Sequence, residues 1–217
     1  MLDADVEKRL QKKTNAHPCN LSAHAASKCT AMQTEEILLI KRIVAGDTES
    51  FAALADRYSR SVYSLTARIA GSAEDAEELT QDTFLKAFDS LDRFDGRSAF
   101  ATWLYRIACN TALSHVRRKR RPACPIDERR IATLPDDEAE RLEDIVDRES
   151  KLEALGRAVD LLEPEERALV TLFYYDDRTI SECAAVMELT EGNVKVRLHR
   201  IRKKLYLLVN ELIDGKE

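Results

Sequence analysis

The sequence contains few of the residues that form tight turns. Six of its 217 residues are glycine and five are proline, roughly 5% of the chain against about 12% in an average protein. β-Sandwiches, barrels and propellers need many tight turns, so the composition argues against these folds. Long apolar runs are missing too, because the longest aliphatic run is residues 37–40. A membrane span needs about 20 apolar residues, so we expect neither a span nor a secretory signal, and hence a cytoplasmic protein.

Cysteine and histidine are also scarce. The five cysteines are odd in number and widely spaced, which argues against a disulfide framework. Near the N-terminus, four side chains could together hold zinc: His17, Cys19, His24 and Cys29. Their spacing matches no zinc motif, so we interpret residues 1–33 as a flexible N-terminal extension and expect no metal and no cofactor. The histidines have no nucleophile or carboxylate at a catalytic spacing, and no glycine-rich phosphate loop is present, so we predict a protein that is not an enzyme.

The net charge of −5 argues by itself against a protein that binds nucleic acid, but the charge is unevenly distributed. Residues 117–130 and 191–204 each carry a net charge of +5, whereas residues 73–95 and 135–149 each carry −6. Basic patches separated by acidic stretches are typical of nucleic-acid-binding proteins.

Apolar residues recur at spacings of three and four through most of the chain after residue 34, which predicts an all-α protein. Pro122 and Pro125 end the first helical part, and an acidic stretch follows them. We therefore predict two small helical domains, at residues 34–121 and 149–217, joined by an acidic flexible linker at residues 122–148.

Capping signals predict where individual helices begin. Ser72 and Asp75 form an S-x-x-D pattern that starts a helix near Ala73, and Thr179 and Glu182 form a capping box. Further helices are expected at residues 98–121, 165–175 and 191–213.

The strongest local pattern is a short helix, a turn of about three residues and a longer basic helix over residues 179–204. This is the helix-turn-helix layout, in which the second helix enters the major groove of DNA. The predicted outer face of that helix carries polar and basic side chains: Asn193, Lys195, Arg197, His199, Arg200, Arg202 and Lys203.

A second basic pattern is the run at residues 117–121, at the end of the helix expected from residue 98. That helix also contains Trp103, Tyr105, Asn110 and His115. Aromatic and amide side chains beside basic ones suit single-stranded or opened DNA. For Trp103 the alternative is core packing, which we favour because its spacing matches that of Phe100 and Ile107.

Four segments taken in order resemble one protein family. Residues 104–121 (LYRIACNTALSHVRRKRR), with the preceding FDGRSAFATW, are similar to the promoter-melting helix of extracytoplasmic-function (ECF) bacterial sigma factors. Residues 74–94 (EDAEELTQDTFLKAFDSLDRF) resemble the core-polymerase-binding helix of that family, and residues 45–65 resemble its first helices. Residues 162–205 resemble its promoter-binding C-terminal domain, so the likeness covers roughly residues 35–213.

The resemblance implies a sigma factor that binds core RNA polymerase through the β′ clamp helices and the β flap. It also implies recognition of −35 and −10 promoter elements in duplex and melted DNA, and an anti-sigma factor as a further partner. By resemblance, the polymerase-binding residues are Asp75, Glu78, Gln81, Asp82, Phe84, Leu85 and Phe88. The −10 residues, which include the loop that captures a flipped base, are Asp95, Gly96, Arg97, Ser98, Phe100, Trp103, Asn110, His115, Arg117, Arg118, Lys119, Arg120 and Arg121. The −35 residues are Asn193, Lys195, Val196, Arg197, His199, Arg200 and Lys203.

Three residues depart from the pattern of the family. Glu188 stands where glycine is usual, Asn193 where threonine is usual, and Val196 where serine is usual. Asn193 and Val196 lie on the helix expected to recognise the −35 element, at residues 191–213. The −35 sequence therefore cannot be taken from relatives. Two alternatives remain open at this point: a stand-alone helix-turn-helix regulator that binds duplex DNA without polymerase, and a sigma-like protein that sequesters polymerase or an anti-sigma factor.

Overall fold

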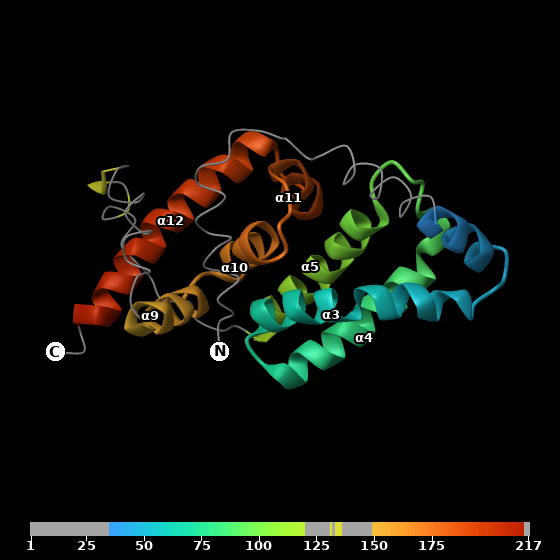
Figure 1. Ribbon diagram of the computed structural model, residues 1–217, viewed down its shortest axis with the longest axis horizontal. Helices are drawn as coiled ribbons and strands as arrows, with labels where there is room; N and C mark the ends of the chain where they lie inside the picture. The colour runs from blue at the N-terminus through green and yellow to red at the C-terminus, as the bar shows by residue number, and fades with distance from the viewer. Residues whose placement is uncertain (1–34, 120–130, 132, 136–148, 215–217) are drawn as a thin grey trace. The chain divides into compact units, whose positions relative to one another are not determined.

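Figure 1 shows the computed structural model, which describes residues 35–119, 131, 133–135 and 149–214. Over these residues the secondary structure is entirely helical, which confirms the all-α prediction. The chain divides into two compact units, formed chiefly by residues 35–118 and by residues 149–214. The domain boundaries predicted at residues 34, 122 and 149 stay a prediction.

The first unit contains a helix at residues 35–44, then α3 (Ser50–Ala70), α4 (Ala73–Asp89), the 3-10 turn η1 (Leu91–Arg93) and α5 (Phe100–Lys119). Gly71 ends α3 in the left-handed conformation, and its N–H donates to the Ala67 carbonyl at 2.8 Å. The Ser72 hydroxyl then accepts from the Asp75 N–H at 3.3 Å and begins α4, as the capping signal predicted. Only two residues separate the helices, so they turn back on each other (Figure 1).

Small and aliphatic side chains form the core of the first unit. Those no more than 1% exposed come from all three long helices: Leu54, Val62, Leu65, Ile69, Ala70, Ala76, Leu79, Ala87, Leu104, Ala108, Cys109 and Ala112. Alanine at these positions of α4 and α5 lets the helices approach closely, and each large aliphatic side chain contributes about 1.5–3 kcal/mol of burial. The core therefore leaves the outer surfaces of α4 and α5 available for other contacts.

The second unit contains α9 (Glu149–Asp160), α10 (Pro164–Val170), η2 (Thr171–Tyr175), α11 (Ile180–Met187) and α12 (Glu191–Asp214). The single helix predicted at residues 165–175 changes to a wider π-helical turn at Thr171. There the Asp176 N–H donates to the Thr171 carbonyl at 2.9 Å, five residues back. The Thr171 hydroxyl donates to the Arg167 carbonyl at 2.8 Å. Thr80 and Thr83 make the same bond inside the regular helix α4, so this bond does not by itself explain the wider turn.

The turn between α11 and α12 requires an unusual backbone at Glu188. Its φ of 56° and ψ of 43° are left-handed, and its N–H donates to the Ala184 carbonyl. Glycine adopts this conformation at little cost, whereas a residue with a Cβ loses about 1–2 kcal/mol. The turn therefore keeps the geometry that glycine would provide, with backbone strain at Glu188.

We expect Glu188→Gly to be more stable than Glu188→Ala by about 1 kcal/mol. Both variants remove the same side chain, so the difference isolates the cost of the left-handed backbone. Urea unfolding followed by circular dichroism measures it. Equal midpoints for the two variants would contradict the prediction.

Candidate polymerase and nucleic-acid interfaces

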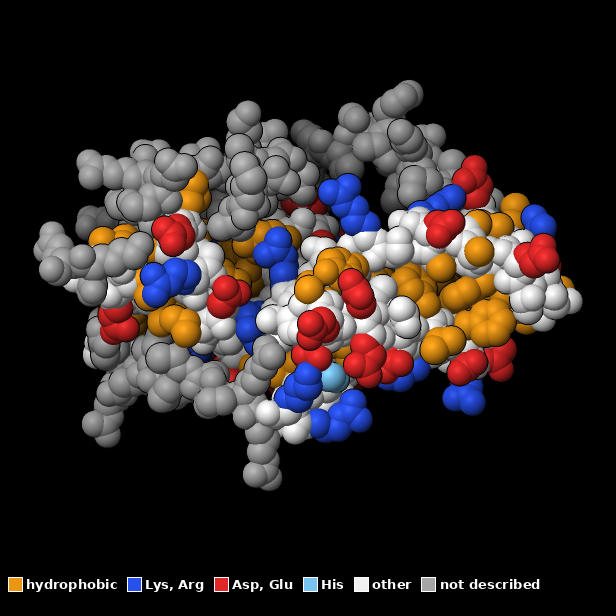
Figure 2. All heavy atoms as spheres, turned by 90° about the horizontal axis from the view of Figure 1, so that it is seen from below, with side chains coloured by type: hydrophobic (Ala, Val, Ile, Leu, Met, Phe, Trp, Pro, Cys, Tyr) orange, Lys and Arg blue, Asp and Glu red, His pale blue; other side chains and the backbone are white. Residues whose placement is uncertain are grey.

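The outer side of α4 carries exposed acidic and apolar side chains. Leu85 is 63% exposed and Phe88 is 38% exposed. Figure 2 shows hydrophobic side chains gathered on part of the surface, with acidic side chains beside them. We name this surface the α4 face and define it by Glu78, Gln81, Asp82, Leu85 and Phe88. Large apolar side chains exposed beside charges mark an interaction surface.

Phe51 of α3 supports the α4 face from behind. The centroid of its ring lies 5.0 Å from that of Phe88 and 6.4 Å from that of Phe84. The planes meet at 70° and 78°, which is the favourable edge-to-face arrangement. Phe84 is half-buried in this cluster. It therefore supports the exposed residues of the α4 face and has little exposed area with which to contact a partner.

Asp75 lies apart from the α4 face to which the sequence assigned it. It is 8% exposed, and its Oδ1 lies 3.5 Å from Nε2 of His115 on α5. His115, which the sequence assigned to promoter DNA, is likewise mostly buried, with 14% of its side chain exposed. These two side chains therefore join α4 to α5 instead of presenting themselves on the surface.

The loop between η1 and α5 borders a pocket of about 230 Å³. Its lining comes from this loop, from α5 and from the helix at residues 35–44: Glu36, Ile37, Phe94, Gly96, Arg97, Ser98, Ala99 and Phe100. Gly96 has a φ of 73°, which glycine adopts without strain. The N–H of Arg97 donates to Asp95 Oδ1 at 3.1 Å, and the Arg97 side chain pairs with the same carboxylate. These bonds, the backbone bond foremost, hold the pKa of Asp95 below its ordinary value.

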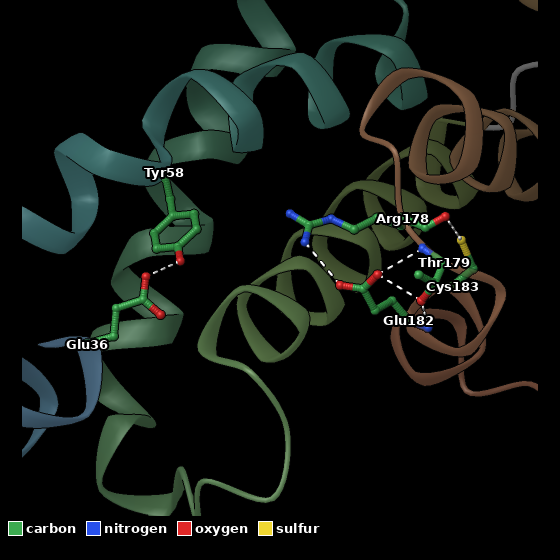
Figure 3. Close-up of polar contacts among 6 residues, drawn as sticks. All are labelled: Glu36, Tyr58, Arg178, Thr179, Glu182 and Cys183. Atoms are coloured by element: carbon green, nitrogen blue, oxygen red, sulfur yellow. Dashed lines mark hydrogen bonds and ion pairs between the residues drawn. The ribbon is translucent and has the colours of Figure 1, made fainter. Parts of the chain in front are cut away.

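Glu36 forms part of the pocket wall and is only 4% exposed. Its Oε1 accepts from the Tyr58 hydroxyl at 2.5 Å and from Arg57 Nη1 at 3.3 Å. Figure 3 shows the contact with Tyr58. The carboxylate thereby fastens the helix at residues 35–44 to α3 and fixes one side of the pocket.

Aromatic rings pack behind the loop. Phe100 is 3% exposed and Trp103 is 9% exposed, and their ring centroids lie 5.6 Å apart. Phe94 contacts both, at 5.8 Å and 5.4 Å, and Tyr58 lies 5.6 Å from Phe100. For Trp103 the core interpretation is therefore the one that the structure supports. Phe100 still lines the pocket from this cluster.

The C-terminal half of α5 presents polar and basic side chains to solvent. Asn110, Arg117, Arg118 and Lys119 are all exposed, while Val116 on the opposite side is 4% exposed. Arg120 and Arg121, predicted to belong to the same patch, lie outside the described residues. The exposed part forms a cationic surface suited to phosphate.

The capping box at the start of α11 is present, as predicted. The Glu182 N–H donates to Thr179 Oγ1 at 3.2 Å, and the Thr179 N–H donates to Glu182 Oε2 at 2.8 Å. Arg178 Nη1 pairs with Glu182 Oε1 at 3.3 Å (Figure 3). Partial burial, the largest influence, raises the pKa of Glu182, but the bonds from Thr179 and Arg178 together outweigh it and lower the pKa below 4.5. Because the folded pKa is depressed, this stabilisation is present above pH 4.5 and is lost as the pH falls through the lower folded value.

The first turns of α12 present the predicted reading residues to solvent. Asn193, Lys195, Val196, Arg197 and Arg200 are exposed, and His199 is half-buried. The Asn193 N–H donates to the Thr190 hydroxyl at 3.2 Å, and Arg197 Nε donates to Asn193 Oδ1 at 3.1 Å. On the opposite side of the helix, Val194, Leu198 and Ile201 are no more than 3% exposed. The helix thus separates a packed side from a polar side that could face DNA.

Lys203 was predicted to lie on the same outer face, and this prediction is wrong. The residue is 9% exposed, and its Nζ donates to the Leu134 carbonyl at 2.6 Å. The physical reason is that Leu134, far away in the sequence, lies against this part of α12 and accepts a hydrogen bond from the lysine. Its amine is therefore engaged within the protein.

Comparisons with known proteins identify both units. Residues 54–122 match the family Sigma-70 region 2, and residues 152–205 match the family Sigma-70, region 4. The ECF RNA polymerase sigma-E factor of Escherichia coli K12 is 32% identical over 187 residues, which cover 83% of this chain and 97% of that relative. The chain belongs to the ECF sigma factor family.

Further relatives agree with this assignment. The ECF RNA polymerase sigma factor SigW of Bacillus subtilis is 29% identical over 187 residues, 80% of this chain and 96% of SigW. Among solved structures, CnrH in complex with the cytosolic domain of CnrY is 25% identical, with a TM-score of 0.56 over 83% of this chain and 97% of CnrH. The sigma factor RpoE of Bartonella quintana, in complex with the anti-sigma factor NepR, shares the fold, with a TM-score of 0.54 over 75% of this chain.

As an ECF sigma factor, the protein binds core RNA polymerase, recognises −35 and −10 promoter elements and promotes initiation of transcription. Its region 2 contains α3, α4 and α5, and its region 4 contains the helix-turn-helix. In the part of the chain that the structure describes, no helix is both long and apolar enough to cross a bilayer. No group of three metal-binding side chains occurs among the same residues, and the candidates His17, Cys19, His24 and Cys29 lie outside them.

Sequence reasoning missed two residues that shape the interfaces of this sigma factor. Glu36 contacts Tyr58, 22 positions away, and Phe51 contacts Phe84 and Phe88 on another helix. Neither contact leaves a local pattern. The only available signal for Glu36 was its spacing of four and seven residues from Ile40 and Ile43, which puts a carboxylate on the apolar side of a short helix.

Proposed function

We propose that the α4 face docks this sigma factor on the β′ clamp helices of core RNA polymerase. Leu85 and Phe88 supply apolar contact, and the surrounding carboxylates, Glu78 and Asp82, complement a basic partner. The exposure of Leu85 and Phe88, at 63% and 38%, on the helix that resembles the core-polymerase-binding helix of the family carries this assignment, because neighbouring exposed apolar side chains beside carboxylates form a surface suited to a partner. The protein acts by binding alone, without catalysis, in the cytoplasm where the polymerase works.

The pocket beside the loop at residues 95–98 receives a single unpaired base of the −10 element. Phe100 offers an apolar wall, Glu36 offers a polar one, and Arg97 is exposed at the loop. Extruding a base costs a few kcal/mol, which burial in a pocket offsets. Asn110, Arg117, Arg118 and Lys119 on α5 then hold the melted non-template strand by its phosphates and bases. Arg120 and Arg121 extend this patch in sequence.

The first turns of α12 read the −35 element in the major groove. Asn193, Lys195, Val196, Arg197, His199 and Arg200 contribute this surface, and Lys203 does not. Residues near the start of the second helix of a helix-turn-helix contact base edges, and later basic residues contact phosphates. Region 4 is held near the −35 element through the β flap of the polymerase.

Regulation by an anti-sigma factor follows from the same surfaces. RpoE of Bartonella quintana is found in complex with the anti-sigma factor NepR, and CnrH with the cytosolic domain of CnrY. A comparable partner would inhibit this protein by covering the α4 face, so that polymerase and inhibitor compete for Leu85 and Phe88.

Run-off transcription on a promoter library tests the proposal. With purified core polymerase, we expect transcripts whose start sites share −35 and −10 motifs and which vanish when the protein is left out. The net charge of −5 should keep binding of the free protein to promoter DNA weak. Specific duplex binding without polymerase would favour a stand-alone regulator, and binding to core polymerase without transcripts would favour a sequestering protein.

A further inference from the structure

The reading helix α12 exposes a valine among polar residues. Val196 is 59% exposed, and it is the only exposed large apolar side chain among the described side chains of residues 149–214. Every other large apolar residue on the first three turns of α12, namely Val194, Leu198 and Ile201, is at most 3% exposed. An apolar side chain is therefore presented where the fold gives it nothing to pack against.

Val196 lies in the middle of the face that would meet the bases. It follows Asn193 by three residues and precedes Arg200 by four, so the three side chains share one side of the helix. It is the sixth residue of α12, which begins at Glu191. In a helix-turn-helix, the N-terminal residues of the second helix contact base edges. Val196 thus occupies a position from which bases are read.

The chemistry of the position selects its contact. Valine neither donates nor accepts hydrogen bonds, and the main apolar group that the major groove displays is the 5-methyl of thymine. The neighbouring Asn193 and Arg197 hold each other by the bond from Arg197 Nε to Asn193 Oδ1 at 3.1 Å. This bond keeps two polar side chains in place beside the valine.

We propose that Val196 contacts the 5-methyl of a thymine and makes this sigma factor select an A·T pair at one position of the −35 element. The inference rests on the proposed reading of −35 DNA by α12. DNA is favoured over a protein partner because Lys195, Arg197 and Arg200 are exposed around the valine. Such a surface complements phosphate.

The test removes single methyl groups from the promoter. Each −35 thymine, on either strand, is replaced in turn by deoxyuridine, which lacks only the 5-methyl, and holoenzyme made with the full chain is assayed by run-off transcription. We expect wild-type transcription to fall about fourfold at one thymine, as for the loss of one buried methyl group. Holoenzyme made with Val196→Ser should transcribe the thymine and the uracil template equally at that position, because serine has no methyl group that could contact the 5-methyl of thymine. Val196→Thr, which keeps one methyl, should retain part of the sensitivity.

The outcomes distinguish this inference from the function on which it rests. Equal sensitivity to uracil in wild type and Val196→Ser, or no sensitive thymine, would overturn the methyl contact. If Val196→Ser lowered transcription equally on every template and bound core polymerase more weakly, Val196 would be assigned to a protein contact. That result would also overturn the methyl contact. If wild type initiated at no unmodified promoter, the proposed −35 recognition itself would fail. Circular dichroism checks that Val196→Ser is folded, as expected for a residue 59% exposed.

Discussion

Replacing Leu85 with arginine should lower the affinity of the protein for core RNA polymerase about 30-fold or more. The substitution removes an apolar contact from the centre of the α4 face and adds a positive charge opposite a partner expected to be basic. Loss of a hot-spot residue at the centre of an interface costs about 2 kcal/mol or more, which is about 30-fold in Kd. Arginine is a good helix former, and Leu85 is 63% exposed, so α4 should keep its structure.

Leu38→Arg is the matched control for this experiment. Leu38 is 57% exposed and belongs to the same unit, but it lies on the helix at residues 35–44 and not on the α4 face. We expect it to bind core polymerase within twofold of wild type in a fluorescence competition assay. If Leu38→Arg weakened binding as much as Leu85→Arg, the effect would reflect charge in general and the α4 face would lose its assignment.

Replacing Arg117, Arg118 and Lys119 together by glutamine should reduce formation of the open promoter complex roughly 50-fold at 0.15 M salt. Three phosphate contacts to a single strand would be lost, so the slope of log affinity against log salt should become shallower by about 2. Binding to core polymerase should stay unchanged because these residues lie on α5 and not on the α4 face. Open-complex formation at several salt concentrations measures both quantities.

A second triple variant removes the same charge from elsewhere in the same unit. Lys41, Arg60 and Arg93 are exposed on other elements of this unit, and their replacement by glutamine should leave the salt slope close to that of wild type. A slope change of equal size in both triples would mean that overall charge, and not the end of α5, attracts the melted strand.

Local signals account for the elements that sequence predicted well. The start of α4 at Ala73 follows from the hydroxyl of Ser72, and the start of α11 follows from the reciprocal bonds of Thr179 and Glu182. The last helix was expected at residues 191–213 and extends over Glu191–Asp214. These features depend on residues within four positions of each other, which periodicity and capping rules describe.

Contacts between distant segments account for what was missed. Lys203 lies three positions after Arg200, so periodicity places it at the edge of the exposed side, but it is 9% exposed and its amine donates to the Leu134 carbonyl, 69 positions away. Asp75 follows Glu74, so the sequence alone predicts that it belongs to a charged surface. In the structure it faces His115 on α5. Helical periodicity gives the direction in which a side chain leaves its own helix and contains no information about which other segment lies there.

The sequence by itself determined that this protein is all-helical, that it has two basic patches and an acidic helix, and that it belongs with the ECF sigma factors. Those properties reside in residue types and short spacings, so they are present before the chain folds. Only the tertiary structure decided which of the candidate residues are accessible. It buried Asp75, Phe100, Trp103 and Lys203, left Leu85 and Val196 in solvent, and formed the pocket beside Glu36, because accessibility depends on packing between segments that are far apart in the chain.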